Sequence, residues 1–135
     1  HPLAWLHWES NFRTVMGKLT DGDYLPLIPA NSISHTLRVE FDRRNKQLKS
    51  YYAFVTLQST FAQHHVGNFE TESDGYNLLN VGLGGSLTVF KQPMDIHLSG
   101  NNLFNTTYIS HLSRLKSEGI PNIGRNVNLG VSVPF

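Results

Sequence analysis

Hydrophobic and polar residues alternate along most of this chain with a period of two. Six runs carry this pattern, and they cover residues 3–19, 33–42, 49–61, 76–90, 94–108 and 125–135. A two-residue period is typical of β-strands that have one apolar and one polar face. Outside the runs, the only expected helix is a single turn within 110–117. The sequence therefore predicts an all-β fold, an antiparallel meander of about six strands.

The last run has the clearest separation of faces. Its polar phase is small and uncharged, which suits a strand placed between lipid and water. One residue fits less well, because Pro134 lacks an N–H and removes one bond from the strand ladder. The apolar phase consists of Val127, Leu129, Val131, Val133 and Phe135, and the polar phase of Asn126, Asn128, Gly130, Ser132 and Pro134.

The connections between the runs alternate in length. Residues 43–47 and 91–93 are expected to form short turns, whereas 20–32, 62–75 and 109–124 are long and polar. In a meander, all three long loops then lie at one end of the sheet and the C-terminus at the other. Outer-membrane barrels have this asymmetry, with the short turns facing the periplasm.

Composition narrows the choice of function. The chain has 135 residues, with 11 Lys and Arg against 10 Asp and Glu, so no strong field favours nucleic acid. No stretch approaches 18 apolar residues without a charge, which argues against a membrane-spanning helix. The absence of cysteine excludes disulfides, thiol catalysis and cysteine-type zinc sites.

Alternation alone shows only that one face of the sheet is dry. A self-contained soluble all-β binding or adhesion module therefore remains an alternative. Two features favour a membrane wall. The polar phases of the later runs are mostly Asn, Ser, Thr and Gly, where a soluble sheet usually carries Lys and Glu. Aromatic residues also gather near the ends of the runs, as in interfacial girdles: Trp5, Trp8, Tyr24, Tyr51, Tyr52, Tyr76, Phe90, Tyr108 and Phe135.

One segment carries a resemblance to a known family. Asn101-Asn-Leu-Phe-Asn105, followed by Tyr108, resembles the penultimate strand of TonB-dependent outer-membrane receptors. Further elements are similar to those of the family and come in the family's order: Leu25-Pro-Leu-Ile-Pro29, Glu70-Thr-Glu-Ser-Asp-Gly-Tyr76, Gly124-Arg-Asn126 and the terminal Phe135.

The resemblance implies that residues 1–135 are the C-terminal part of a much larger barrel. The family's barrel has roughly 22 strands around a plugged lumen, so the plug and the earlier strands are absent from this chain. The opening His1-Pro2, with no initiator Met or signal peptide, suggests a processed or truncated product. Six strands would not close such a barrel, and the chain alone is expected to expose two bare edges.

The function implied by the resemblance is active, TonB-dependent uptake of a scarce nutrient across the outer membrane of a Gram-negative bacterium. The nutrient would be a metal chelate, a metal ion, haem or a similar small ligand. This chain would supply barrel wall and extracellular loops. Its expected partners are the rest of the barrel and plug, TonB through the missing plug region, the assembly machinery, the lipid bilayer and the nutrient, but not nucleic acid.

The closing strand is also assigned a role by the resemblance. Leu129, Val131, Val133 and Phe135 are expected to form the signal that the outer-membrane assembly machinery recognises. An exposed strand edge with a regular apolar row can pair with another sheet by β-augmentation. The alternative is that Phe135 only anchors the strand in the membrane interface.

Histidines invite a metal hypothesis, with His64, His65 and His111 as candidate ligands in the long loops. Imidazole suits zinc and haem iron, and 111–126 also resembles the corresponding loop of receptors for zinc or haem. Adjacent histidines on a strand point to opposite faces, however, and ordinary solvated loop histidines are the alternative. No cofactor is expected. His35 lies on an apolar phase and His97 on a polar one, and a position at a strand end or in the lumen would explain each without a bound ligand.

No catalytic set stands out, so an enzyme is not expected. The acidic residues of the long loops have no nucleophile or paired base in a recognisable register, and we expect them to be solvated. An outer-membrane barrel lipase or protease is therefore disfavoured. The acidic residues concerned are Asp21, Asp23, Glu70, Glu72 and Asp74.

Overall fold

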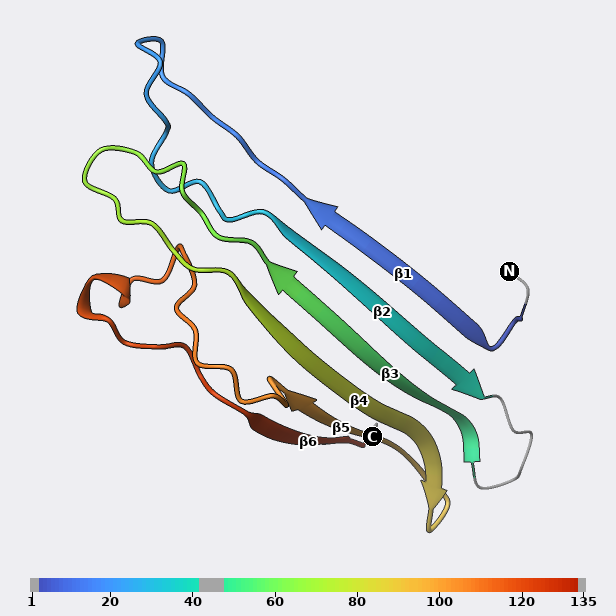
Figure 1. The fold of residues 1–135 in the computed structure, drawn as a ribbon. Helices are drawn as coiled ribbons and strands as arrows, with labels where there is room; N and C mark the ends of the chain where they lie inside the picture. Colours follow the sequence, from blue (N-terminus) through green and yellow to red (C-terminus); the bar gives the residue numbers. More distant parts are fainter. Residues whose placement is uncertain (1–2, 42–47, 134–135) are drawn as a thin grey trace.

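The computed structural model describes residues 3–41 and 48–133 as a single antiparallel sheet in which sequential strands are neighbours (Figure 1). The predicted all-β, six-stranded antiparallel meander is confirmed. The sheet is open rather than closed into a barrel, because the first and last strands form its two edges. The elements are β1 (Leu6–Arg13), β2 (Ser32–Phe41), β3 (Leu48–Thr60), β4 (Tyr76–Val89), β5 (Gln92–Asn101), the 3₁₀ turn η1 (Lys116–Glu118) and β6 (Asn126–Ser132).

Two strands are shorter than their alternation predicted. β1 ends at Arg13, opposite Ser32, and not near residue 19, because the chain there leaves the ladder for a small loop closed by an isolated bridge. β5 ends at Asn101 and not at residue 108, because Asn102 adopts a left-handed conformation with φ of 51°. Phe104, which falls within the predicted run 94–108, therefore lies in a loop.

The tight β4–β5 turn consists of Phe90 and Lys91 and not of the predicted residues 91–93. Both residues have positive φ, 49° and 67°, as the two central residues of a type I′ hairpin do. This turn matches the right-handed twist of its strands, although asparagine and glycine usually occupy it. The other short connection, predicted at 43–47, lies outside the described residues.

The register separates the sheet into two chemically different faces, as the alternation predicted. One cross-strand row aligns Trp8, Leu37, Val55 and Val81, and the next row aligns Glu9, Thr36, Thr56 and Asn80. We call the first the apolar face and the second the polar face. No Asp, Glu, Lys or Arg lies on the apolar face among the strand residues whose side chains are described.

The molecule has almost no hydrophobic core. Leu78 is the only buried hydrophobic residue among those described, whereas Trp8 is 76% exposed and Leu129 70%. The accessible surface is 10091 Å². A soluble monomer of this mass would expose about 7,100 Å², so about 3,000 Å² more surface is open than a compact fold would leave. Apolar side chains of the sheet supply much of it.

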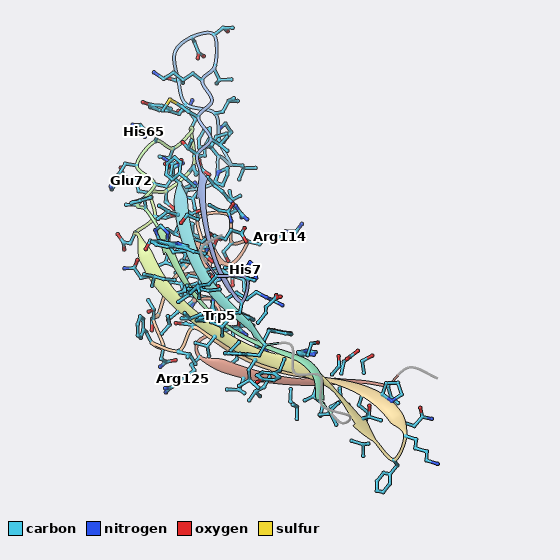
Figure 2. All side chains as sticks on the ribbon, turned by 90° about the vertical axis from the view of Figure 1, so that its right-hand side faces the viewer. Trp5, His7, His65, Glu72, Arg114 and Arg125 are labelled. Atoms are coloured by element: carbon cyan, nitrogen blue, oxygen red, sulfur yellow. The ribbon has the colours of Figure 1, made fainter. Side chains whose placement is uncertain are left out.

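Glycines on the polar face allow aromatic rings to lie flat against the sheet. A Cβ on Gly82 would come within 2.4 Å of the Phe54 ring, and one on Gly130 within 1.9 Å of the His97 ring. Each pair consists of direct cross-strand neighbours. The rings cover backbone that glycine leaves bare, an arrangement that stabilises strongly curved sheets. Figure 2 shows the curvature, with the lower part of the sheet turned away from the upper part.

The three long connections lie together at one end of the sheet, as predicted (Figure 1). They are residues 14–31, 61–75 and 102–125, which we call loops A, B and C. The β4–β5 turn lies at the opposite end, which β6 also approaches. Among the described residues no helix is long and apolar enough to cross a membrane.

Candidate functional site: the loop cluster

Glu70 connects loops A and B. Its Oε2 accepts a hydrogen bond from the backbone N–H of Gly67 and its Oε1 one from that of Leu27, each at 3.1 Å. Gly67 permits this approach, because a Cβ there would lie only 2.6 Å from the backbone nitrogen of Pro26. Leu27 has a φ of 60°, a conformation that costs energy for a branched side chain. The carboxylate therefore holds two backbone donors in place.

His111 brings loop C into contact with the Glu70 carboxylate. Its Nε2 lies 3.2 Å from Glu70 Oε1, and its Nδ1 lies 2.7 Å from Ser73 Oγ. The imidazole side chain is only 3% exposed and the Glu70 side chain 11%. Buried ionisable groups of this kind are retained only where partners offset the loss of water.

Lys116, at the start of η1, completes the cluster. Its ammonium group donates to the backbone carbonyl of Thr71 and lies 3.2 Å from His111 Nδ1. Two cationic or potentially cationic groups therefore face one carboxylate. The loop cluster, defined as Glu70, Ser73, His111 and Lys116, joins all three loops without a hydrophobic core.

The electrostatics of the loop cluster favour neutral His111 beside charged Glu70. Burial and the nearby Lys116 ammonium lower the pKa of His111, while Glu70 opposes the shift. Burial would raise the pKa of Glu70. The backbone donors of Gly67 and Leu27, together with His111 and Lys116, outweigh it, and the net effect lowers that pKa. The expectation that Glu70 is a solvated loop acid is therefore wrong.

A second set of contacts braces loops A and B. Gln63, which is buried, pairs its backbone with Ser73 and donates its side-chain N–H to the Ile28 carbonyl at 3.2 Å. The Tyr24 ring lies tilted against the His65 ring, with the centroids 4.6 Å apart, and is 4.9 Å from the Lys18 ammonium. These contacts place loop A alongside loop B independently of the Glu70 carboxylate.

The segment that carried the family resemblance shapes loop C. The buried Asn102 amide accepts from the Thr106 N–H and donates to the Thr106 carbonyl, both at 2.9 Å. Asn105, also left-handed, accepts from the Arg125 N–H at 3.0 Å and so connects the segment to the start of β6. The Tyr108 ring lies tilted against Tyr76 with the centroids 4.3 Å apart, and burial together with Tyr76 raises the pKa of its hydroxyl. The asparagines therefore have a structural role.

Loops B and C enclose a cleft of about 470 Å³. Its lining includes the Tyr76–Tyr108 pair, Asp74 and Lys116. A smaller cavity of about 220 Å³ lies between the loop end of the strands and His111, with Arg13 and Tyr76 in its walls. Both hollows are polar enough to admit water or a small polar molecule.

The three candidate metal ligands have different surroundings. His64 pairs with Glu72 at 2.7 Å and is 65% exposed, His65 contacts the Tyr24 ring, and His111 belongs to the loop cluster (Figure 2 labels His65 and Glu72). Within the described ranges, no group of three or more His, Asp or Glu side chains is arranged to hold a metal ion. The metal hypothesis gains no support from this arrangement.

Two further histidines lie on the strands. His35 is in the interior of β2 on the apolar face, where its Nδ1 lies 2.8 Å from Ser10 Oγ. A strand-end position for His35 was therefore wrong, and Ser10 meets its hydrogen-bonding need instead. His97 covers Gly130 on the polar face. Both are explained by local contacts.

The proposed assembly residues lie on or beside the edge strand. Leu129 and Val131 are on the apolar face of β6, 70% and 53% exposed, and Val133 follows the strand at 45%. Phe135 and Pro134 lie outside the described residues. No protein-family model matches the chain.

Proposed function

We propose that this chain is wall and extracellular loop of an outer-membrane β-barrel, the C-terminal part of a TonB-dependent receptor that imports a scarce nutrient. The TonB-dependent identity is supported by the ordered motifs, above all the Asn101–Asn105 segment and Tyr108. The membrane location is supported by the physical character of the sheet. The rest of the barrel, the plug, TonB and a small nutrient ligand are the partners that follow.

The observation that carries the proposal is the exposed apolar face, which has no charged residue among the strand residues whose side chains are described. In water, leaving such side chains exposed costs roughly 25 cal/mol per Å² of apolar surface. Leu83, Val127 and Leu129 are each more than half exposed on this face. A surrounding apolar medium removes that cost. A lipid bilayer is such a medium, and it tolerates strands whose backbone groups pair within the sheet.

Strand length and aromatic positions agree with this environment. A tilted membrane strand needs about 9–11 residues, and β2, β3 and β4 have 10, 13 and 14. At the end opposite the long loops, the Phe41 ring stacks between Trp5 at 6.2 Å and Tyr51 at 5.1 Å. Stacked aromatics at the rim of an apolar face are typical of the lipid–water boundary.

The free edge of β6 supports the role proposed for the closing strand. β6 pairs with β5 on one side only, so its other edge is open to a further strand. Leu129, Val131 and Val133 present a row of apolar side chains beside that edge. We propose that this row, with Phe135, is what the assembly machinery recognises, and that β6 then closes against the first strand of the complete barrel.

Spin labelling tests the wall directly, and the absence of cysteine in these residues makes single labels simple to introduce. Leu129→Cys and Asn128→Cys form a matched pair of neighbours on opposite faces. In the complete protein reconstituted in lipid vesicles, a label at 129 should collide mainly with dissolved oxygen. A label at 128 should collide relatively more with a water-soluble nickel chelate.

Equal collision ratios at the two positions would contradict the membrane wall and favour a soluble all-β binding module. The transport role needs a separate measurement. Energised uptake of the scarce nutrient should be lost in cells that lack either this protein or TonB.

A further inference from the structure

At Glu70, whose side chain is 11% exposed, the structure brings all three long loops together. Glu70 holds loop A through the Leu27 N–H, at 3.1 Å, and its own loop through Gly67. Loop C depends on it through His111, whose Nε2 lies 3.2 Å from the carboxylate. A change of charge at His111 therefore changes the contact between loops B and C.

We propose that the loop cluster is a proton-controlled latch, which holds the three long loops together when His111 is neutral and releases loop C when His111 is protonated. The latch concerns loop movement and goes beyond the proposed transport role. It does not depend on which nutrient the protein binds.

The charges around His111 explain the direction of the switch. Glu70 in loop B would attract an imidazolium, but the Lys116 ammonium in loop C lies only 3.2 Å from Nδ1. Arg13 at the end of β1 and Tyr76 of β4 line the cavity next to the ring. Ser73 in loop B can donate its hydroxyl proton to neutral Nδ1, and this arrangement must reverse when Nδ1 gains a proton.

Burial adds to this repulsion. With the side chain only 3% exposed, little water is available to solvate a new positive charge. An imidazolium can escape both the burial and the ammonium if loop C moves away from loop B. Loop C also contacts β4 through the Asn102 N–H, which donates to Asn80 Oδ1, and through the Tyr76–Tyr108 pair, and neither contact includes a histidine or a carboxylate.

The sign of the pH dependence follows from the lowered pKa of His111. A lowered pKa means that the closed loops bind the proton less well than open loops, whose histidine titrates near 6.5. The closed state is therefore fully favoured above pH 6.5, and its advantage falls as the pH drops below that value. Glu70, also lowered, weakens the closed state further only below about 4.5.

The experiment measures the separation of loops B and C in the complete protein. Phe69→Cys and Arg114→Cys place a spin-label pair on exposed positions of the two loops. Electron–electron distance measurements are then made between about pH 8 and pH 5, the range in which histidine titrates. We expect one narrow distance distribution at the upper end and a growing population of longer distances below pH 6.5.

Three variants in the labelled background identify the titrating group. His111→Gln keeps hydrogen-bonding atoms but cannot be protonated, so the longer distances should not grow in on acidification. Lys116→Met removes the repelling ammonium, so the transition should move to lower pH. His64→Gln is the matched control, since His64 pairs with a carboxylate in the same loop but is 65% exposed. It should behave like the unmodified protein.

Distances that do not change with pH in the unmodified protein would overturn the latch, as would an acid transition that persists in His111→Gln. If His111→Gln is already open at the upper pH, Lys116→Met decides. An unshifted acid transition in that variant contradicts the latch, and a transition moved to lower pH supports it. A failure of the labels at 128 and 129 to distinguish the two faces of the sheet would leave this result intact, so the two proposals fail separately.

Discussion

The sheet and the loop cluster differ in which side chains they bury. On the sheet, the described apolar side chains of one face are exposed or half-buried, and Leu78 is the only buried hydrophobic residue among those described. The buried polar residues Gln63, Asn102 and His111 all lie in the loops. A water-soluble protein usually has the opposite arrangement, with apolar side chains inside and polar ones on the surface.

The two regions therefore depend on their surroundings in different ways. The sheet satisfies its backbone by strand pairing, and its apolar face is stable only against an apolar medium. The loop end has no such face, and each of its buried polar residues, Gln63, Asn102 and His111, makes a hydrogen bond to another side chain or to backbone. Changing the solvent should act on the sheet, whereas changing protonation or a single hydrogen bond should act on the loops.

The largest effect is expected from a charge on the apolar face. Val127→Arg puts a guanidinium in the row that contains Trp8, Leu37 and Val55, near the middle of the apolar band. In a bilayer this should lower the free energy of unfolding by about 2–4 kcal/mol. Urea titration of the complete protein in lipid vesicles measures the change.

Asn128→Arg is the matched control for this first prediction. It introduces the same side chain one residue away on the polar face, and the free energy of unfolding should change much less. If both variants lost the same stability, the difference between the two faces would have no bearing on stability. The apolar medium that we assume around the apolar face would then be wrong.

A smaller effect is expected on the polar face of the sheet, at Gly82. Gly82→Ala should lower the free energy of unfolding by about 1–3 kcal/mol, because the added methyl overlaps the Phe54 ring 2.4 Å from the Cβ position. In a Phe54→Ala background, which lacks the ring, Gly82→Ala should be nearly neutral. A double-mutant cycle measures this coupling, and simple additivity would contradict the aromatic-on-glycine contact.

The sequence was sufficient to predict the sheet because each strand carries its own two-residue pattern. The order, the direction of the strands and the identity of the two faces all follow from alternation and loop length. Boundaries were less predictable. β5 ends where Asn102 turns left-handed and its amide binds Thr106, an interaction between polar side chain and backbone that leaves no trace in the apolar pattern.

The loop cluster was largely beyond prediction. From its residue type His111 is predicted only as a candidate metal ligand, and Glu70 only as one of several solvated loop acids. The two residues are 41 positions apart in loops without periodicity, so no pattern in the chain couples them. Their contact depends on how loops A, B and C meet at one end of the sheet. The only local signal was glycine at position 67, which allows loop A to approach.

The smallest effect is expected at the second histidine–carboxylate pair, which sharpens the comparison within the loops. His64 and Glu72 are closer than His111 and Glu70, at 2.7 Å against 3.2 Å, but both are more than 60% exposed. Exposed pairs contribute about 0–1 kcal/mol, so Glu72→Ala should hardly change loop stability. Glu70→Ala instead leaves the N–H groups of Leu27 and Gly67 without their acceptor, which costs about 1–3 kcal/mol.

Hydrogen exchange at these two amides distinguishes the pairs. In Glu72→Ala the protection of the Leu27 and Gly67 amides should stay unchanged, and in Glu70→Ala it should fall. Equal loss in both variants would mean that proximity of charges, and not burial with backbone hydrogen bonding, holds the loops. Because the two carboxylates are two residues apart in the same loop, any difference between the variants reports what each carboxylate contacts and not where it lies in the chain.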